Sequence, residues 1–335
     1  MKLLTLVSTL SALVALVHAS PSPSSLSKSR LSKRDSRTSA PSGAVTVDVA
    51  GSGSYTTISA ALEAGETSIF ILPGTYEEQV SITQDGTVLY GYTSAVSSYS
   101  SNEVTITYGL SQLDVSGNDA TGTLRIHAND VSIFKPPPFP SPSPWSAHRH
   151  VLLASDNLNV VNSYGKGSQA LALSAYGERQ GFYGCSFSGY QDTILTNEGT
   201  QYFVQNYVEG ATDFIFGQTA NTYFTNSILA IVGAGYIAAP GRESDDETGM
   251  YVFNSCTIKQ ADSVSTDLTG QAYLGRPWRN YARAVYKYCS ISSVVNSAGW
   301  HIWNTGDERT DNILFGEYQN SARLLPLRFP SEPGS

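Results

Sequence analysis

Two aspartates and a glutamine recur at a shared spacing in the middle of the chain. Gln169, Asp192 and Asp213 each stand seven residues after a two-residue unit that ends a strand-like run. If these units mark the same point on successive coils of a solenoid, the three side chains stack on one face, about 4.8 Å apart per coil. Two carboxylates can then share nucleophilic and proton-transfer roles, while an amide donates to a developing oxyanion. The spacing therefore predicts a catalytic site on one face of a solenoid.

The repeated units define the coils that would position these side chains. They follow one another at spacings of 23, 21, 20, 28 and 35 residues, and aromatic or β-branched residues precede each of them. Such runs are typical of short strands, and a period of about 20–24 residues is typical of solenoid coils. We predict an all-β fold, a single-stranded right-handed parallel β-helix, with an antiparallel sandwich as the alternative. The units are Asn162-Ser163, Cys185-Ser186, Asn206-Tyr207, Asn226-Ser227, Asn254-Ser255 and Cys289-Ser290.

A short helix is expected near the start of the solenoid. The segment 59–64 follows a run of Tyr, Thr and Ile, with Ser59 as its N-cap and Gly65 at its C-terminal end. An N-terminal capping helix would cover the exposed edge of the first coil.

The N-terminal segment predicts export from the cell. Residues 1–19 combine Lys2, an apolar stretch and the small-residue site Val17-His18-Ala19, as in a secretory signal peptide. Residues 20–43 are rich in Ser and Pro and are not expected to fold, and Lys33-Arg34 resembles a dibasic processing site. Removing residues 1–34 moves the net charge from −8 to −13, because five basic residues and no acidic one are lost. We expect a secreted, extracellular monomer that binds neither nucleic acid nor membrane.

Three cysteines are present, so they cannot all pair within one chain. Cys185 and Cys289 begin two of the repeated units, and Cys256 lies two residues past another. Their positions favour small buried residues, and a disulfide between any two of them is left open.

Several ordered motifs resemble the pectin methylesterase family, specifically its secreted fungal type. The resemblance covers residues 44–133 and 157–318 and implies the right-handed parallel β-helix fold. It also implies hydrolysis of the methyl esters of homogalacturonan (pectin) to pectate and methanol. The motifs are Gly74-Thr75-Tyr76-Glu77-Glu78, Gly167-Ser168-Gln169-Ala170-Leu171, Gly189-Tyr190-Gln191-Asp192-Thr193, Asp213-Phe214-Ile215-Phe216-Gly217, Leu274-Gly275-Arg276-Pro277-Trp278 and Gly299-Trp300-His301-Ile302-Trp303.

The resemblance assigns roles to the catalytic residues. Asp213 is expected to attack the ester carbonyl, and Arg276 to keep that carboxylate ionised and oriented. Asp192 is expected to protonate the departing methanol and then activate water. Gln169 and Gln191 are expected to donate to the oxyanion. A Gly-x-Ser-x-Gly elbow is absent from the sequence, which argues against a serine nucleophile.

Substrate binding is expected at Trp278, as a platform for a sugar face, and at Arg242 and Tyr76. Trp300 and Trp303 fit the core or a cleft wall. No cofactor and no metal site are expected, because the acidic run at 243–247 lacks a liganding pattern. The expected partner is pectin.

Two segments depart from the family pattern. Residues 134–156 hold six of the 15 prolines, which cannot donate to a strand ladder. We interpret them as a translated intron or another gene-model error, with a genuine bulging loop as the alternative. The tail, residues 321–335, is shorter than in the family. Two other functions therefore stay open: an inactive pectin-binding relative, and a β-helical pectate lyase or polygalacturonase.

Overall fold

The computed structural model describes residues 36–131 and 155–321. The chain divides into residues 1–33 and 34–335, and the fold described below belongs to the second part. The predicted signal peptide, most of the insert and nearly all of the tail lie outside the described residues.

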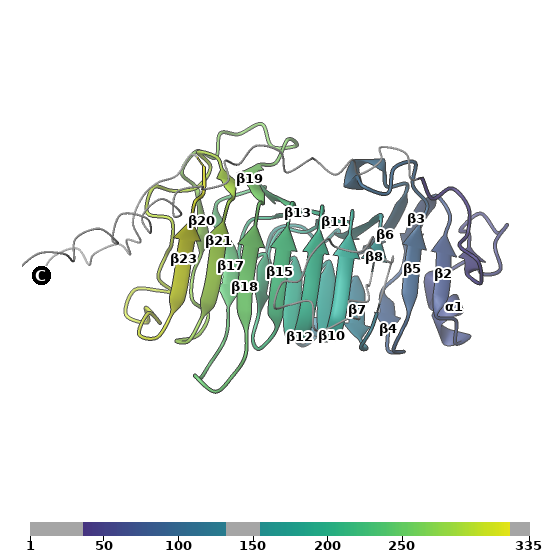
Figure 1. Ribbon diagram of the computed structural model, residues 1–335, viewed down its shortest axis with the longest axis horizontal. Helices are drawn as coiled ribbons and strands as arrows, with labels where there is room; N and C mark the ends of the chain where they lie inside the picture. Colours follow the sequence, from purple (N-terminus) through teal and green to yellow (C-terminus); the bar gives the residue numbers. More distant parts are fainter. Residues whose placement is uncertain (1–35, 132–154, 322–335) are drawn as a thin grey trace, which may run out of the picture. The chain divides into compact units, whose positions relative to one another are not determined.

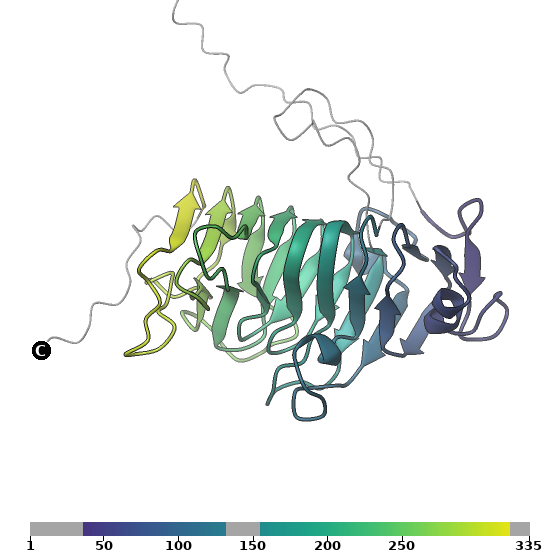
Figure 2. The same ribbon diagram turned by 90° about the horizontal axis from the view of Figure 1, so that it is seen from below.

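All pairings between the named strands are parallel, and they form two sheets (Figures 1 and 2). The 8-stranded sheet contains β3 (Gly74–Glu77), β6 (Val104–Tyr108), β9 (Leu158–Asn162), β11 (Ser186–Ser188), β13 (Tyr207–Gly210), β16 (Ile228–Ile231), β19 (Thr257–Gln260) and β22 (Ser290–Ile291).

The 15-stranded sheet has one long row and a branch. The long row contains β1 (Val45–Val47), β2 (Ser68–Ile71), β5 (Val88–Gly91), β8 (Ser155–Asp156), β10 (Leu173–Tyr183), β12 (Ile194–Val204), β15 (Asn221–Thr225), β18 (Met250–Asn254), β21 (Arg283–Lys287) and β23 (Leu314–Tyr318). The branch, which we call the site face, contains β4 (Val80–Ile82), β7 (Leu124–His127), the first residues of β10 and β12, β14 (Ile215–Gly217), β17 (Gly235–Pro240) and β20 (Ala272–Gly275).

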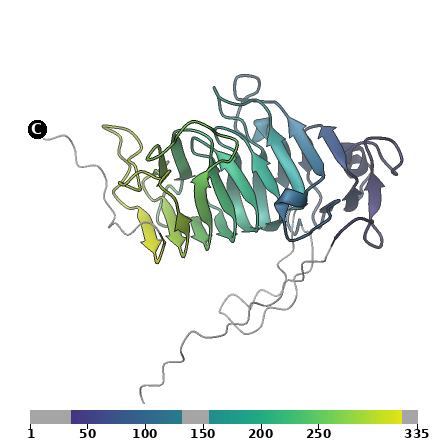
Figure 3. The ribbon, with the colours of Figure 1, turned by 90° about the horizontal axis from the view of Figure 1, so that it is seen from above.

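Successive coils stack in sequence order, so the colours run steadily along the strands from purple to yellow (Figure 3). This arrangement confirms the predicted parallel β-helix and excludes the antiparallel sandwich. The helices within it are short: α1 (Ile58–Glu63) and the 3-10 turns η1 (Tyr99–Ser101) and η2 (Asp119–Thr121).

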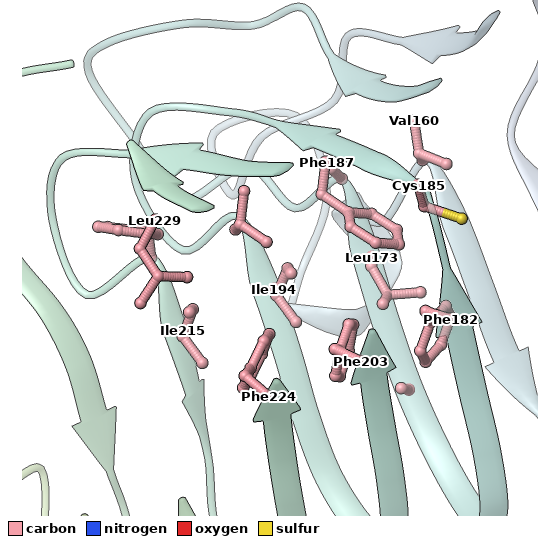
Figure 4. Packing of buried hydrophobic residues seen from close by; sticks show 14 of the residues in the cluster. Val160, Leu173, Phe182, Cys185, Phe187, Ile194, Phe203, Ile215, Phe224 and Leu229 are labelled. Carbon is pink, nitrogen blue, oxygen red and sulfur yellow. The ribbon is translucent and has the colours of Figure 1, made fainter. Parts of the chain in front are cut away.

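An aromatic ladder fills the core between the coils. Phe182, Phe203, Phe224, Phe253 and Tyr286 are all buried and stack one above the next, with ring centroids 4.3–5.1 Å apart. The first three rings appear in the packed interior in Figure 4. Each ring comes from the same point of the long row, because parallel in-register strands place equivalent residues above one another.

The coils repeat at a turn that differs from the predicted unit. In each coil a residue with positive φ precedes a buried residue, and the turn amides bond to the next coil. Cys185, Asn206 and Cys289 are the buried residues of this turn. Asn226 is instead a positive-φ residue of the turn, and Asn162 and Asn254 lie outside it. This turn was not recognised from the sequence because many residue types occupy it. The equivalent pairs are Asn157-Leu158, Gly184-Cys185, Gln205-Asn206, Asn226-Ser227, Ser255-Cys256, Tyr288-Cys289 and Gln319-Asn320.

The predicted helix is present, but its cap differs. Thr57, not Ser59, is the N-cap, and its side chain accepts from the Ala60 amide at 3.1 Å. Ser59 instead donates to Glu78, whose carboxylate also accepts the amides of Ile58 and Ser59 at 2.8 Å each. A carboxylate from a neighbouring coil thus satisfies the free amides of the first turn. The helix packs against β1, β2 and β4; that it shields the first coil stays a prediction.

Two predicted boundaries were wrong. The Arg37 amide and carbonyl both bond to Thr93, and the buried Arg37 side chain donates to the Gly91 carbonyl, so the folded part starts before residue 44. At the other boundary, the last two residues of the predicted insert form β8, which pairs with β5 and β10. The three cysteines are buried, as expected of small core residues. No helix within the described residues has the length and apolarity needed to cross a membrane.

Candidate active site

Asp192 and Asp213 lie side by side on adjacent coils, each two residues before a strand of the site face. A parallel bridge joins Gln191 to Thr212, and the Asp192 amide donates to the Thr212 carbonyl at 3.0 Å. This register confirms the predicted pairing of the two aspartates. Both residues have left-handed backbones, with φ of 63° and 48°, and both side chains are buried. Strained, buried aspartates of this kind are typical of functional sites.

The two glutamines flank this pair, although Gln169 is out of the predicted register. The Ala170 amide donates to the Gln191 carbonyl at 3.2 Å, and Leu173 pairs with Ile194. Gln169 therefore lies before the level of Asp192 rather than level with it. Both glutamine side chains are half-buried, and within the described residues neither side-chain nitrogen donates a hydrogen bond. Both nitrogens are therefore available to a substrate oxygen.

Arg276 holds Asp213 by two hydrogen bonds. Its Nε donates to Oδ1 at 3.0 Å and its Nη2 to Oδ2 at 2.6 Å, while Nη1 donates to the Trp303 carbonyl at 3.3 Å. The guanidinium also lies 4.1 Å from the ring centroids of both Tyr236 and Trp303. These contacts lock its orientation, so the bidentate pair presents Asp213 in one geometry. The contact of Tyr236 was not predicted, because it joins strand β17 to Arg276, which follows β20.

Burial and charge separate the two carboxyl groups. Burial and the neighbouring Asp213 raise the pKa of Asp192 well above its usual value, and Arg276 opposes this only in part. Burial also raises the pKa of Asp213, but the hydrogen bonds and charge of Arg276 lower it. Asp213 therefore loses its proton first, and Asp192 keeps its proton to higher pH. One group is available as a nucleophile while the other can donate a proton.

Trp278 borders a hollow on the site face. Its ring lies over Gly241, where a Cβ would come within 2.3 Å of it, and meets the edge of Phe216 at 6.0 Å between centroids. The hollow has a volume of about 320 Å³ and lies between the site face and the loop 116–120. Leu195 and Phe216, which also line it, stand three residues after Asp192 and Asp213, respectively. That shared position was a sequence signal for Phe216 that the prediction missed.

Two predicted substrate-binding residues are placed elsewhere. Tyr76 is only 2% exposed, and its hydroxyl lies 2.9 Å from the Leu72 carbonyl in the first coils. Arg242 is 1% exposed; its Nε donates to the Glu247 carbonyl at 2.6 Å and its guanidinium lies over Tyr281. Both predictions were wrong, because these side chains fasten the chain rather than face a ligand. Trp300 is buried in the core, as anticipated.

The site as a whole supports covalent ester chemistry by carboxylates. Asp213 is oriented by Arg276, and the neighbouring Asp192 has a pKa raised well above its usual value. Within residues 36–131 and 155–321, no group of three or more His, Cys, Asp and Glu could hold a metal ion.

Known proteins share this sequence pattern and this fold. The family model described as Pectinesterase matches residues 143–324. The pectinesterase of Aspergillus aculeatus is 41% identical, over 85% of this chain and 83% of its own. Pectinesterase A of Emericella nidulans is also 41% identical, over 82% of each chain.

Solved structures agree with these sequence matches. The crystal structure of the pectin methylesterase from Aspergillus niger superposes with a TM-score of 0.74 at 39% identity, covering 86% of this chain and 88% of that one. The pectin methylesterase from carrot superposes with a TM-score of 0.69 at 25% identity, covering 88% and 90%.

Proposed function

This chain belongs to the pectinesterase family and hydrolyses the methyl esters of pectin, and we propose that Asp213 is the nucleophile of that reaction. The observation that carries the proposal is the bidentate pair between Arg276 and Asp213, one coil away from Asp192, whose pKa is raised by burial and by Asp213. An ionised carboxylate and a carboxylic acid in neighbouring positions are the two groups that a two-step ester hydrolysis needs.

The first step forms a covalent intermediate. A carboxylate oxygen of Asp213 attacks the carbonyl carbon of a galacturonate methyl ester. The amide nitrogens of Gln169 and Gln191 donate to the oxygen that becomes negative. As the bond between the carbonyl carbon and the methoxy oxygen breaks, Asp192 gives its proton to that oxygen, and methanol leaves. Asp213 and the galacturonate are then joined as an anhydride.

The second step returns the enzyme to its starting state. Asp192, now ionised, takes a proton from a water molecule while the water oxygen attacks the galacturonate carbonyl. The bond to Asp213 breaks, which leaves an ionised Asp213 and a galacturonic acid carboxyl group, and that carboxyl group then loses its proton to solvent. Throughout the cycle Arg276 keeps Asp213 oriented, and its charge favours the ionised leaving group.

Trp278 is proposed as the platform for a sugar ring next to the scissile ester. Its half-buried ring borders the hollow lined by Tyr176, Leu195 and Phe216, which continues the site face away from Asp213. A sugar ring needs an apolar surface for its C–H face and polar groups at its rim. The hollow offers both, because Asn118, Asn197 and Gln218 line it as well.

The test is release of methanol from highly methylated pectin. We expect methanol without shortening of the polymer, and loss of release in Asp213→Ala with pectin binding retained. The exposed Asp246→Ala is the matched control and should stay active. An active Asp213→Ala would refute the proposed nucleophile. Chain cleavage would favour a lyase or polygalacturonase, and binding without methanol release in the unmodified protein would favour an inactive relative.

We further propose that the protein acts outside the cell as a monomer after processing at Lys33-Arg34. The support is the apolar, signal-like start of the chain and the dibasic pair that ends the first 33–34 residues.

A further inference from the structure

Arg309 contacts Trp278, the proposed sugar platform, and Trp303, the ring that supports Arg276. Its Nη1 donates to the backbone carbonyl of Trp278, and its guanidinium lies 4.7 Å from the ring centroid of Trp303. The same Trp303 ring lies 4.1 Å from the guanidinium of Arg276, and its carbonyl accepts from Arg276. One side chain therefore links Trp278 and Arg276, although it touches neither the aspartates nor the hollow.

Hydrogen bonds and an ion pair within its own loop hold Arg309 in place. Asn304 and Asp307 exchange backbone hydrogen bonds of 3.1 Å, and the Trp303 amide donates to the Glu308 carbonyl at 3.1 Å. Asp307 pairs with Arg309 through both carboxylate oxygens, the shorter contact being 2.6 Å. The pKa of Asp307 is lowered, mainly by this bond, so the pair stays charged. Arg309 has φ of 59°, a left-handed backbone that a non-glycine residue adopts only where its surroundings favour it.

The backbone amide of Trp278 has a hydrogen-bond partner as well as its carbonyl. The Trp278 amide donates to the Pro240 carbonyl at 3.0 Å, next to the Gly241 that supports the indole ring. Arg309 supplies the donor for the carbonyl of the same residue. Without that donor, the turn after Trp278 loses a charge-assisted hydrogen bond, and the indole ring is less precisely placed.

We propose that Arg309 is a positioning residue that couples the placement of Trp278 to that of Arg276 through Trp303. The inference rests on the proposed roles of Trp278 and Asp213. Arg309 acts through other residues: its contact with Trp303 stabilises the ring on which Arg276 rests, and Arg276 in turn holds Asp213. Its removal should therefore disturb substrate binding and the ionisation of the nucleophile together.

The proposal is tested with Arg309→Ala and Arg309→Lys. Arg309→Ala should lower kcat/KM for methylated pectin about 100-fold, because misplacement of positioning groups by about 1 Å has effects of that size. KM should rise and kcat should fall. The acidic limb of the pH profile should move to higher pH because Arg276 is held less firmly against Asp213. Arg309→Lys keeps a cation and a donor and should recover part of the loss.

Arg179→Ala is the matched control. Arg179 also has a positive φ (56°) and forms a two-point ion pair, with Asp130, but in the described structure it contacts neither Trp278, Trp303 nor Arg276. If Arg309→Ala and Arg179→Ala have the same kcat/KM and the same acidic limb, the proposal is wrong. A loss in Arg309→Ala without a shift of the acidic limb would also overturn the coupling to Arg276.

Asp307→Asn serves as the second variant if Arg309→Ala does not fold. It keeps the arginine but weakens its ion pair, so a smaller change in the same direction is expected in KM, kcat and the acidic limb; unchanged values would count against the proposal. Thermal melting separates this effect from general instability. The unmodified protein must release methanol in the same assay. If it does not, the proposed function fails, whereas an active unmodified protein with unaffected Arg309 variants rejects only the positioning role.

Discussion

At the scale of single residues, Asp192 and Asp213 work against the stability of the fold. Both are buried, both have left-handed backbones and both have raised pKa values. A carboxyl group whose pKa is higher in the folded than in the unfolded state destabilises the fold once it ionises. The site therefore retains groups that a purely structural position would not favour.

We predict that Asp192→Asn raises the melting temperature at neutral pH. The folded protein binds the Asp192 proton more tightly than the unfolded chain does. Ionisation therefore costs stability as pH rises above the unfolded pKa of about 3.9. Asparagine does not ionise, so the gain should be largest near neutral pH and absent near about pH 3. Thermal melts across this range check it, with the exposed Asp246→Asn as control. A gain that does not vary with pH would contradict the explanation.

We predict a bell-shaped pH profile for methanol release. The rate should rise from low pH as Asp213 ionises and fall at higher pH as Asp192 loses its proton. In Arg276→Gln the acidic limb of kcat/KM should move to higher pH, since the guanidinium that lowers the Asp213 pKa is gone. Initial rates measured over the full pH range test this. An unmoved acidic limb would show that another group controls it.

At the scale of elements, stacked rings hold successive coils together. Phe224 is fully buried between Phe203 and Phe253, at 4.3 and 5.1 Å between ring centroids. Tyr223, the preceding residue, points to the opposite face of the same strand, where it is partly exposed and stacks on Tyr202. Neighbouring residues of one strand therefore offer an inner and an outer ring for comparison.

We predict that Phe224→Ala lowers the free energy of unfolding by about 3–5 kcal/mol, as expected for a large cavity in a packed core. Tyr223→Ala should cost clearly less, because its ring is not enclosed on all sides. Denaturant titration of both variants gives the two free energies. Equal losses would show that the inner ladder is not the main source of cohesion between coils.

The elements also show why caps were harder to predict than strands. Aromatic and β-branched residues identified the strand runs, because each strand carries its own composition. The helix cap depended on a distant residue: Glu78 accepts two amides of the first turn and the Ser59 hydroxyl, leaving Thr57 as the cap. Local sequence cannot show which of two nearby hydroxyl residues a neighbouring coil will bind.

At the scale of the whole molecule, we predict where the mature protein begins. We expect the protein recovered from culture medium to begin at Asp35, after cleavage following Lys33-Arg34. The loss of five basic residues should make it more acidic than the full chain. N-terminal sequencing and intact mass check this. A start at residue 20, or retention in the cell, would contradict processing at the dibasic pair.

The same sample tests the proline-rich insert. A tryptic peptide from within residues 134–149 would establish a genuine loop and reject a translated intron. A peptide that joins the residues before 134 directly to those at 155–156 would support the intron, and these last two residues already pair as β8.

The sequence alone determined the β-helix and the pairing of Asp192 with Asp213, because a parallel register turns equal spacing along the chain into adjacency in space. It also indicated Arg276 and Trp278 through their motif. The tertiary structure decided what surrounds these residues. Arg276 lies over Tyr236 and Trp303, whereas Tyr76 and Arg242 are buried within the fold. Those contacts join segments from separate coils and loops. Burial and stacking between distant segments depend on how the loops pack, which no spacing within the chain encodes.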